Sequence, residues 1–267
     1  MKSKRLIAIL GVLVFLIVLI VINSTLFTLQ KISVNWLTSK YQLESVKDYQ
    51  IVENIKLGQS IFLVQKDEII TTLEKENPYL RVVSVETKFP NKLVVHSAER
   101  ESLYAIKLSD NEYAIVDELG KVLELTDDRI FEGAEADLGT RPIVVNFDNL
   151  SLNLKDFEEG KNIGINYVET LISGFSKSLR ESSYTPTTSK GVIKSIDVIS
   201  LSESSKLSIQ TRNGMVISIN DMEKYTTDKL LLGFELYNTL HNRGVVDCTI
   251  QVWHNANSGQ IYADVDW

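Results

Sequence analysis

The stretch VETKFPNKLVVHSAER, residues 85–100, contains two short runs of alternating apolar residues separated by a turn signal that contains proline. Pro90 fixes its own backbone φ and favours an extended conformation for Phe89, while Asn91 tolerates tight-turn geometry. Apolar residues that recur with a period of two are typical of half-buried strands. The stretch therefore predicts a β-hairpin, with alternating apolar positions at Val83, Val85, Leu93 and Val95.

The residues before this hairpin predict one further strand and two helices. Apolar residues at near-helical spacing indicate a helix over Lys40–Asn54. A second helix is expected over Asp67–Glu76, with Asp67 as its N-cap. Residues 27–100 are therefore predicted to form a small α+β domain. Its first strand is indicated by Leu29, Ile32 and Val34.

The N-terminus has the pattern of a membrane anchor. Three basic residues within positions 1–5 precede the run Leu6–Ile22, which contains no charged or strongly polar side chain. A helix of this length spans about 26 Å, close to the thickness of the hydrocarbon core. A cleaved signal peptide is the alternative, but its apolar core is shorter and a small-x-small cleavage site should follow it. We therefore expect a cytoplasmic tail at 1–5, a transmembrane anchor at 6–26 and the remainder outside the cytoplasm.

Beyond the anchor, the chain is acidic and has no second apolar stretch of comparable length. Without the basic residues of the tail, 25 basic side chains stand against 35 acidic ones, a formal charge of −10. This excess argues against binding to nucleic acid and against direct attraction to anionic lipid headgroups. The bilayer is therefore expected to be contacted through the anchor.

Residues 101–267 predict a mixed, mainly antiparallel β-domain with two packed helices. Turn signals separate many short strands, among them Asp117–Gly120 and the strong hairpin signal Asn213-Gly214. The helices are expected over Asn162–Leu179 and Thr227–Leu240, where apolar residues recur at helical spacing. A loop is expected over Ser182–Lys190, and strands over Tyr113–Val116, Lys121–Leu125, Ile143–Phe147, Ile193–Leu201, Lys206–Thr211, Met215–Asn220, Val245–Trp253 and Gln260–Val265.

The sequence contains no recognisable catalytic motif. The histidines His96, His241 and His254 lack the spacing of zinc ligands. Cys248, the only cysteine, has no disulfide partner and no local signature of a thiol nucleophile. Acidic pairs such as Glu158-Glu159 are expected on the solvated loops of so acidic a chain. We therefore predict a non-catalytic protein, without metal or cofactor, that acts through binding.

The order of these features resembles the FtsQ/DivIB family of bacterial cell division proteins over nearly the whole chain. The shared order is a short basic tail, one anchor, a POTRA-type module and a mixed β-domain. The resemblance assigns Pro90 and Asn91 to the hairpin of that module, with Glu99-Arg100 at its junction to the β-domain. The local matches are Gly58–Phe62, Pro78–Leu80, Phe89–Leu93, Glu99-Arg100, Val116–Val122, Asn213-Gly214, Lys229-Leu230 and Val246-Asp247.

The resemblance implies a non-catalytic scaffold of the divisome that helps to regulate septal peptidoglycan synthesis. It implies binding to small bitopic coiled-coil proteins of the FtsL and FtsB type, with septal peptidoglycan synthases as further partners. It implies a single-pass type II protein of the cell membrane, concentrated at the division septum, with an extracytoplasmic C-terminal ectodomain. Two other functions stay open: a membrane-anchored cell-wall enzyme or sensor, and a POTRA module for polypeptide transport.

The two terminal strands are the candidate partner site. The resemblance implies that a partner adds a strand to the C-terminal edge of the β-domain, a mode in which backbone hydrogen bonds supply affinity. The strands predicted over Val245–Trp253 and Gln260–Val265 contain no proline, which is one of the residues that blunt exposed edges. The candidate contacts are Val245, Asp247, Thr249, Gln251 and Trp253.

Overall fold

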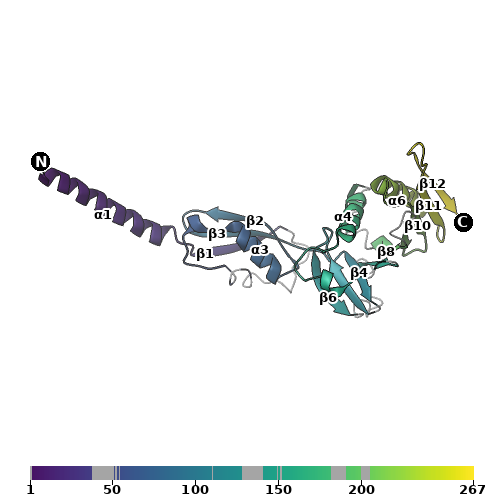
Figure 1. Ribbon diagram of the computed structural model, residues 1–267, viewed down its shortest axis with the longest axis horizontal. Helices are drawn as coiled ribbons and strands as arrows, with labels where there is room; N and C mark the ends of the chain where they lie inside the picture. Colours follow the sequence, from purple (N-terminus) through teal and green to yellow (C-terminus); the bar gives the residue numbers. More distant parts are fainter. Residues whose placement is uncertain are drawn as a thin grey trace. The chain divides into compact units, whose positions relative to one another are not determined.

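The structure is a computed structural model that describes residues 2–37, 51, 53, 55–109, 111–127, 141–148, 150, 152–181, 191–199 and 205–267. The chain divides into two compact units, an N-terminal unit at Met1–Arg100 and a C-terminal unit at Glu101–Trp267 (Figure 1). The predicted loop Ser182–Lys190 lies outside the described residues. The predicted helix Lys40–Asn54 also lies outside them, apart from two positions, 51 and 53.

Helix α1 extends over Lys2–Leu26 and contains the apolar run near the N-terminus (Figure 1). Its described side chains, at positions 10–21 and 26, are all exposed. Among the residues that the structure describes, no helix has both the length and the apolar character that crossing a bilayer requires.

The N-terminal unit is built on a three-stranded sheet with the strand order β1-β3-β2. β2 (Leu80–Lys88) and β3 (Lys92–Glu99) pair antiparallel around a three-residue turn, which confirms the predicted hairpin. The predicted first strand is β1 (Lys31–Trp36), which pairs parallel with β3. The 3-10 helix η1 (Ile61–Leu63) and helix α3 (Lys66–Glu76) precede β2.

Two details of this unit differ from the sequence prediction. α3 begins at Lys66, so Asp67 is not its cap but lies in the first turn, where the helix dipole favours a carboxylate. The alternating pattern predicts that Val83 points to the same buried face as Val85, yet Val83 is 51% exposed. The β2–β3 register shifts between Val82 and Ser84, and this irregularity moves Val82 into the core instead.

The core of the N-terminal unit lies between α3 and the sheet. α3 packs mainly against β2, and alternate side chains of β2 and β3 point toward the helix. This burial of one sheet face is what the alternating sequence pattern implies. The buried members of this core are Leu29, Ile51, Ile55, Leu73, Leu80, Val82, Val85, Leu93 and Val95.

A buried ion pair ties the end of β3 to α3. Arg100 Nη2 lies 2.8 Å from Glu74 Oε2, and both side chains are largely shielded from water. Arg100 Nε also donates to the carbonyl of Leu80 (3.3 Å), and the amide of Val82 donates to Glu74 Oε1 (2.8 Å). Because both members of the pair also bind the β2 backbone, they fix the last residue of the unit to α3 and to β2.

In the described part of the chain, the C-terminal unit contains a nine-stranded mixed sheet in the order β12-β11-β10-β9-β8-β7-β4-β5-β6. The pairs β4–β7, β7–β8 and β10–β11 are parallel and the others are antiparallel, so the sheet is mainly antiparallel as predicted. The strands are β4 (Tyr104–Ser109), β5 (Glu112–Val116), β6 (Val122–Asp127), β7 (Ile143–Phe147), β8 (Ile193–Val198), β9 (Lys206–Thr211), β10 (Val216–Asn220), β11 (Thr249–His254) and β12 (Ile261–Asp266).

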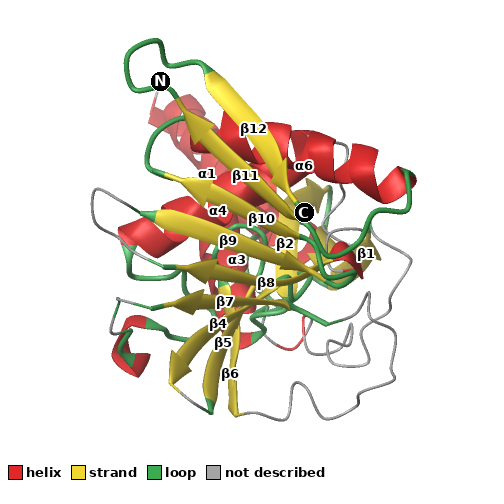
Figure 2. Cartoon of the chain, turned by 90° about the vertical axis from the view of Figure 1, so that its right-hand side faces the viewer, coloured by secondary structure: helices red, strands yellow, loops and turns green. Residues whose placement is uncertain are grey.

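The two predicted helices of this unit, α4 (Asn166–Glu181) and α6 (Thr226–Asn242), pack on one face of the sheet and lie behind it in Figure 2. Phe175 of α4 lies between Tyr104 of β4, with ring centroids 6.1 Å apart, and Phe234 of α6, at 6.0 Å. The Tyr104 hydroxyl lies 2.7 Å from Ser176 Oγ, and burial raises the pKa of Tyr104. α4 therefore covers the β4 region, whereas α6 contacts β10, β11 and β12.

Strand β4 has no counterpart in the sequence prediction. Tyr104, Ala105 and Ile106 are buried one after another, so no alternation with polar residues marks the strand. β4 pairs antiparallel with β5 on one side and parallel with β7 on the other. A strand that is internal to the sheet and buried on both faces reads as a continuous apolar run, which periodicity alone does not assign.

A buried cation holds the turn between β10 and α6. Lys229 of α6 is fully buried, and its ammonium group donates to the carbonyls of Asn220 (2.9 Å) and Asp221 (2.6 Å). Asp221 and Tyr225 have positive φ values of 50° and 54°, a region that is unfavourable for residues other than glycine. Burial lowers the pKa of Lys229, and the charge of Asp221 opposes that shift. The ammonium group thus satisfies two carbonyls within a strained turn.

Replacing Glu74 by alanine should destabilise the N-terminal unit by about 3 kcal/mol, because the guanidinium of Arg100 stays buried without its ionic partner. Urea unfolding of the full chain measures this free energy. The fluorescence of Trp36 reports on the N-terminal unit alone when Trp253 and Trp267 are replaced by phenylalanine.

The control for this experiment is Lys88→Ala, which removes an exposed ion pair with Glu86 in the same unit. Exposed pairs add little to stability, so the unfolding midpoint should stay unchanged. Equal midpoints for Glu74→Ala and the unmodified chain would contradict the role given to the buried pair.

Replacing Lys229 by methionine should destabilise the C-terminal unit by about 2–4 kcal/mol, because the carbonyls of Asn220 and Asp221 lose their shared donor while the apolar stem is kept. Urea unfolding followed by Trp253 fluorescence tests this. Lys224→Met, the same change at an exposed position of that turn, is the matched control. If both variants unfold at the same urea concentration, the buried ammonium does not hold the turn.

Candidate partner-binding edge

The chain ends in an antiparallel hairpin formed by β11 and β12, in agreement with the two terminal strands of the prediction. Trp253 lies opposite Tyr262 in its register. The amide of Asn255 donates to the carbonyl of Gln260 (2.8 Å) and closes the connecting turn. The hydrogen bond between Asn255 and Gln260 therefore determines which backbone groups of β11 and β12 point toward the neighbouring strand of the hairpin.

The first of these strands starts later than the sequence predicts. β11 begins at Thr249 and not at Val245, because Gly244 and Asp247 have positive φ values of 76° and 56° that interrupt an extended chain. Val245 is half-buried, and its amide donates to the carbonyl of Leu240 (3.1 Å). Val245 and Asp247, two of the predicted contacts, therefore lie in the connection between α6 and β11.

At the terminal hairpin, the free edge of the sheet is β12 and not β11. β11 pairs parallel with β10 on one side and antiparallel with β12 on the other. Within the described residues, β12 has a neighbour on one side only. The remaining predicted contacts, Thr249, Gln251 and Trp253, belong to the internal strand. Their backbone groups face neighbouring strands, so only their side chains are left for a partner.

The backbone groups of β12 point alternately toward β11 and toward the free side. Asn255 and Gln260 form a hydrogen-bonded pair, and such pairs recur at every second position of an antiparallel ladder. The backbone groups of Tyr262, Asp264 and Asp266 therefore point toward β11. The amide of Val265 points outward, and the side chain of Asp264 accepts a hydrogen bond from it (2.8 Å). The residues whose backbone groups face outward are Ile261, Ala263 and Val265.

An apolar surface borders this edge on the helix-covered side. Gly233 of α6 faces the sheet, and Phe234 contacts α4. At 100° per residue, Leu232 and Leu236 lie on the side of α6 turned away from α4, which is the side of β12. We use the name edge shelf for these two leucines together with the half-buried side chains of Ile261, Ala263 and Val265.

The opposite face of the hairpin carries aromatic and acidic side chains. Trp253 and Tyr262 stack across the two strands, with ring centroids 6.1 Å apart and planes inclined by 21°. Asp264 and Asp266 follow Tyr262 at alternate positions of β12 and are exposed. In the part of the chain that the structure describes, neither carboxylate has a cationic partner. A partner at this edge would meet an acidic, aromatic outer face.

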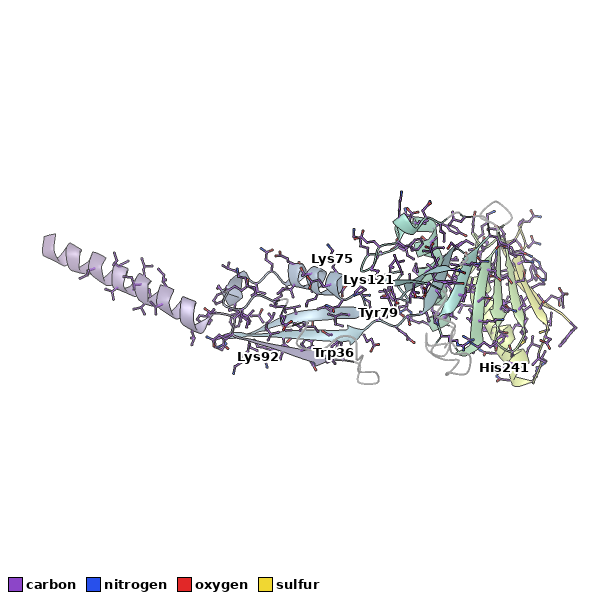
Figure 3. All side chains as sticks on the ribbon, turned by 90° about the horizontal axis from the view of Figure 1, so that it is seen from below. Trp36, Lys75, Tyr79, Lys92, Lys121 and His241 are labelled. Atoms are coloured by element: carbon purple, nitrogen blue, oxygen red, sulfur yellow. The ribbon has the colours of Figure 1, made fainter. Side chains whose placement is uncertain are left out.

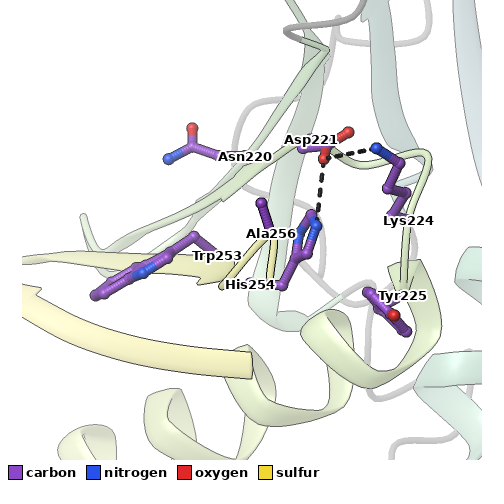
Figure 4. Close-up of a pocket in the computed structure, with 7 residues that line it drawn as sticks. All are labelled: Asn220, Asp221, Lys224, Tyr225, Trp253, His254 and Ala256. Carbon is purple, nitrogen blue, oxygen red and sulfur yellow. Dashed lines mark ion pairs between the residues drawn. The ribbon is translucent and has the colours of Figure 1, made fainter. Parts of the chain in front are cut away.

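A pocket of about 330 Å³ lies where the turn before α6 meets the end of β11 (Figure 4). Asp221 Oδ2 lies 3.5 Å from His254 Nε2 and 3.8 Å from Lys224 Nζ. The ring of Tyr225 meets that of His254 edge-on at 5.2 Å. These contacts join the terminal hairpin to the turn that Lys229 holds. The pocket is lined by Asn220, Asp221, Lys224, Tyr225, Trp253, His254 and Ala256.

No local sequence pattern indicates this pocket, because its lining residues come from separate elements, the turn before α6 and the end of β11. Each histidine has a partner in the fold: the side-chain nitrogen of Asn35 lies 3.1 Å from His96 Nδ1, and His241, labelled in Figure 3, stacks on Tyr237 with ring centroids 5.6 Å apart. Among the described residues, no group of three metal-ligating side chains gathers.

The thiol of Cys248 is buried, and burial raises its pKa. A thiol with a raised pKa carries less of the reactive thiolate at neutral pH. The side chain also belongs to the main core of the C-terminal unit. Cys248 therefore has the environment of a structural residue.

Comparison with known proteins gives one family model and several relatives. The model for the POTRA domain, FtsQ-type, matches residues 39–100. The cell division protein DivIB of Clostridium botulinum (strain Hall) is 32% identical over 126 residues, which cover 46% of this chain and 47% of that protein. DivIB of Clostridium acetobutylicum is 34% identical over 86 residues, covering 30% of this chain and 32% of that protein.

A further relative, DivIB of Clostridium tetani, is 31% identical over 86 residues, or 32% of each chain. The chain thus spans about half the length of the curated relatives it matches, or less. The domain match and the relatives agree with one another and with the order of features along the sequence. On this evidence, residues 39–100 match an FtsQ-type POTRA domain, and the chain is similar to cell division proteins named DivIB.

Proposed function

We propose that this protein is a non-catalytic, membrane-anchored scaffold of the bacterial divisome that binds a partner strand along β12. The observation that carries the proposal is the free edge of the sheet, where Ile261, Ala263 and Val265 direct backbone groups outward beside the edge shelf. Strand addition uses such groups for affinity and alternate side chains for selectivity. The relatives' role in cell division provides the biological setting.

The partners that fit are small bitopic coiled-coil proteins of the FtsL and FtsB type. A strand added beside β12 would place alternate side chains on the edge shelf and the others on the outer face. There they would meet Tyr262, Asp264 and Asp266, so basic and aromatic side chains are favoured. Septal peptidoglycan synthases are proposed as further partners, and by binding them the scaffold would help to regulate septal peptidoglycan synthesis.

The residues predicted as contacts keep different roles in this proposal. Thr249, Gln251 and Trp253 lie one strand further from the edge, about 10 Å from an added strand. Long side chains of a partner can reach them across β12. Val245 and Asp247 lie before β11, and their contact with a partner stays a prediction that depends on how far the partner extends.

We assign the anchoring role to α1. The apolar run Leu6–Ile22 falls within this helix, and its described side chains at 10–21 are exposed, as lipid contact requires. The proposal places residues 1–5 in the cytoplasm and 6–26 in the bilayer. The ectodomain is then extracytoplasmic, with single-pass type II topology, and concentrates at the division septum.

Replacing Ala263 by proline should weaken binding of the FtsB-type partner by about tenfold or more, because it removes one outward donor from the free edge. The hydrogen bonds between β11 and β12 are kept, since the backbone amide and carbonyl of Ala263 point away from β11. Affinity of the full chain for the FtsL- and FtsB-type proteins of the same organism, measured by biolayer interferometry, tests the expectation.

The matched control is Ala263→Ser, which changes the side chain at the same position and retains the amide. It should bind within about threefold of the unmodified chain, and both variants should unfold at the same temperature. Full binding by a folded Ala263→Pro chain would rule out strand addition at this edge.

The scaffold role predicts where the protein is found in dividing cells. A fluorescent protein fused to the N-terminus should form bands at midcell, and depletion should give filamentous or misdivided cells. Uniform membrane fluorescence with normal division would reject the divisome role. Peptidoglycan treated with the full chain should release no soluble fragments, and release would favour a cell-wall enzyme.

A further inference from the structure

Three phenylalanine rings meet at one end of the N-terminal unit. Phe27, Phe62 and Phe89 have ring centroids 5.2–6.4 Å apart, so each ring contacts the other two. The cluster is not a core, because Phe62 is 59% exposed, Phe89 62% and the adjacent Leu63 73%. Large apolar side chains that gather on a surface mark a binding site. These four residues are called the aromatic end below.

Backbone hydrogen bonds fix the aromatic end at the point where the chain leaves α1. Phe27 directly follows the last residue of α1, and its carbonyl accepts a bond from the amide of Ile61 (2.8 Å). The amide of Gln30 donates to the carbonyl of Asn91 in the β2–β3 turn (2.9 Å). Consecutive Cα atoms are about 3.8 Å apart, so a bilayer that holds α1 comes within one residue of the cluster.

A row of lysines crosses the sheet at the same end. Lys92 of β3 lies opposite Lys31 of β1 on one side and Lys88 of β2 on the other, so the three side chains leave the same face. Figure 3 shows Lys92 at the end of the unit next to α1 and Tyr79 at the other end. Among the described residues, Glu86 is the acidic partner of Lys88 (2.7 Å), and Lys31 and Lys92 have none.

Such a row is unfavourable in the isolated chain, because like charges directly opposite each other destabilise a sheet. An anionic surface would reverse the sign of this interaction. Phenyl rings and lysine side chains can also both be placed at the interface of a bilayer, where the rings are buried at the boundary between headgroups and acyl chains and the ammonium groups meet anionic headgroups.

We propose that the aromatic end inserts into the membrane interface, with the lysine row against anionic lipid headgroups. This inference rests on the proposed anchoring by α1 and adds a second point of attachment. The rings of Phe62 and Phe89 reach the acyl boundary, and Lys31 and Lys92 contact lipid phosphates. The sheet of the N-terminal unit is then held at a fixed orientation to the bilayer. It is attached at the aromatic end as well as through α1, so it cannot rotate freely about the connection to α1.

The acidic character of the whole chain does not oppose this placement. Electrostatic attraction between exposed charges is screened beyond about 8 Å at physiological ionic strength. A headgroup at the aromatic end therefore responds to the nearest side chains and not to the sum over the chain. On the sheet face that carries the lysine row, the charged side chains at this end of β1, β2 and β3 are Lys31, Lys88 and Lys92, with Glu86 as the acidic neighbour of Lys88.

Spin-label accessibility in the full chain tests the proposal. Cys248 is replaced by alanine, and single cysteines for labelling are placed at Leu63 in the aromatic end, at Leu16 in α1 and at the exposed Val83 of β2. Val83 lies about 20 Å along the strand from the turn. Each chain is reconstituted into nanodiscs of phosphatidylcholine and phosphatidylglycerol, and collisions with oxygen and with a water-soluble nickel chelate are measured.

The expected result is that the labels at Leu16 and Leu63 collide with oxygen and are protected from nickel, while the label at Val83 collides with nickel. A label at Leu63 that collides freely with nickel, with Leu16 protected, overturns the inference and leaves the anchor intact. Exposure of Leu16 to nickel overturns the anchor and the inference together. Protection of Leu63 from both reagents indicates a protein contact and also overturns the inference.

Charge reversal separates the lysine row from the phenyl rings. Lys31→Glu combined with Lys92→Glu should increase nickel collisions at Leu63 in nanodiscs that contain phosphatidylglycerol. The double change Lys75→Glu at the end of α3 and Arg81→Glu at the end of β2 remote from Lys88 is matched in charge and should leave these collisions unchanged. An equal effect of both pairs would show that overall charge, and not the lysine row, sets the contact.

Discussion

Backbone amides and carbonyls need hydrogen-bond partners, and this requirement organises the C-terminal unit. Within the described residues, seven of its nine strands have a neighbouring strand on both sides, and β12 and β6 each have a neighbour on one side only. At β12, the carboxylate of Asp264 covers the outward amide of Val265. A side chain that occupies one donor blunts the edge against unspecific pairing, yet a partner strand can displace it. The same geometry therefore protects the edge and keeps it available.

Each unit contains a buried cationic side chain that holds a helix to a neighbouring strand or turn. Arg100 joins the end of β3 to α3 and β2, and Lys229 joins α6 to the turn after β10. Burying a charge is unfavourable, and the hydrogen bonds that each cation makes offset that penalty. Such groups add little net stability compared with apolar residues. They do specify geometry, because a shifted helix or turn would leave the charge buried without partners.

Charge on this protein is arranged locally, although the chain as a whole is acidic. The outer face of the terminal hairpin carries Asp264 and Asp266, while lysines line the end of the N-terminal sheet. Screening limits each patch to its own surroundings. The hairpin edge therefore favours a basic partner, and the aromatic end favours an anionic surface. An average over the sequence hides this difference, since it assigns both surfaces the same sign.

Local sequence patterns determined the elements of this protein and much of its architecture. Pro90 and Asn91 mark the hairpin of the N-terminal unit, and helical spacing marks α4 and α6, because turn chemistry and periodicity act over a few residues. The strand β4 escaped detection because burial on both faces removes alternation. Tertiary structure alone decided that β10 pairs parallel with β11, which makes β12 the free edge and moves the outward backbone groups to Ile261, Ala263 and Val265. It alone brought Phe27, Phe62 and Phe89 together, because contacts between residues distant in the chain depend on the packing of whole elements and leave no local pattern.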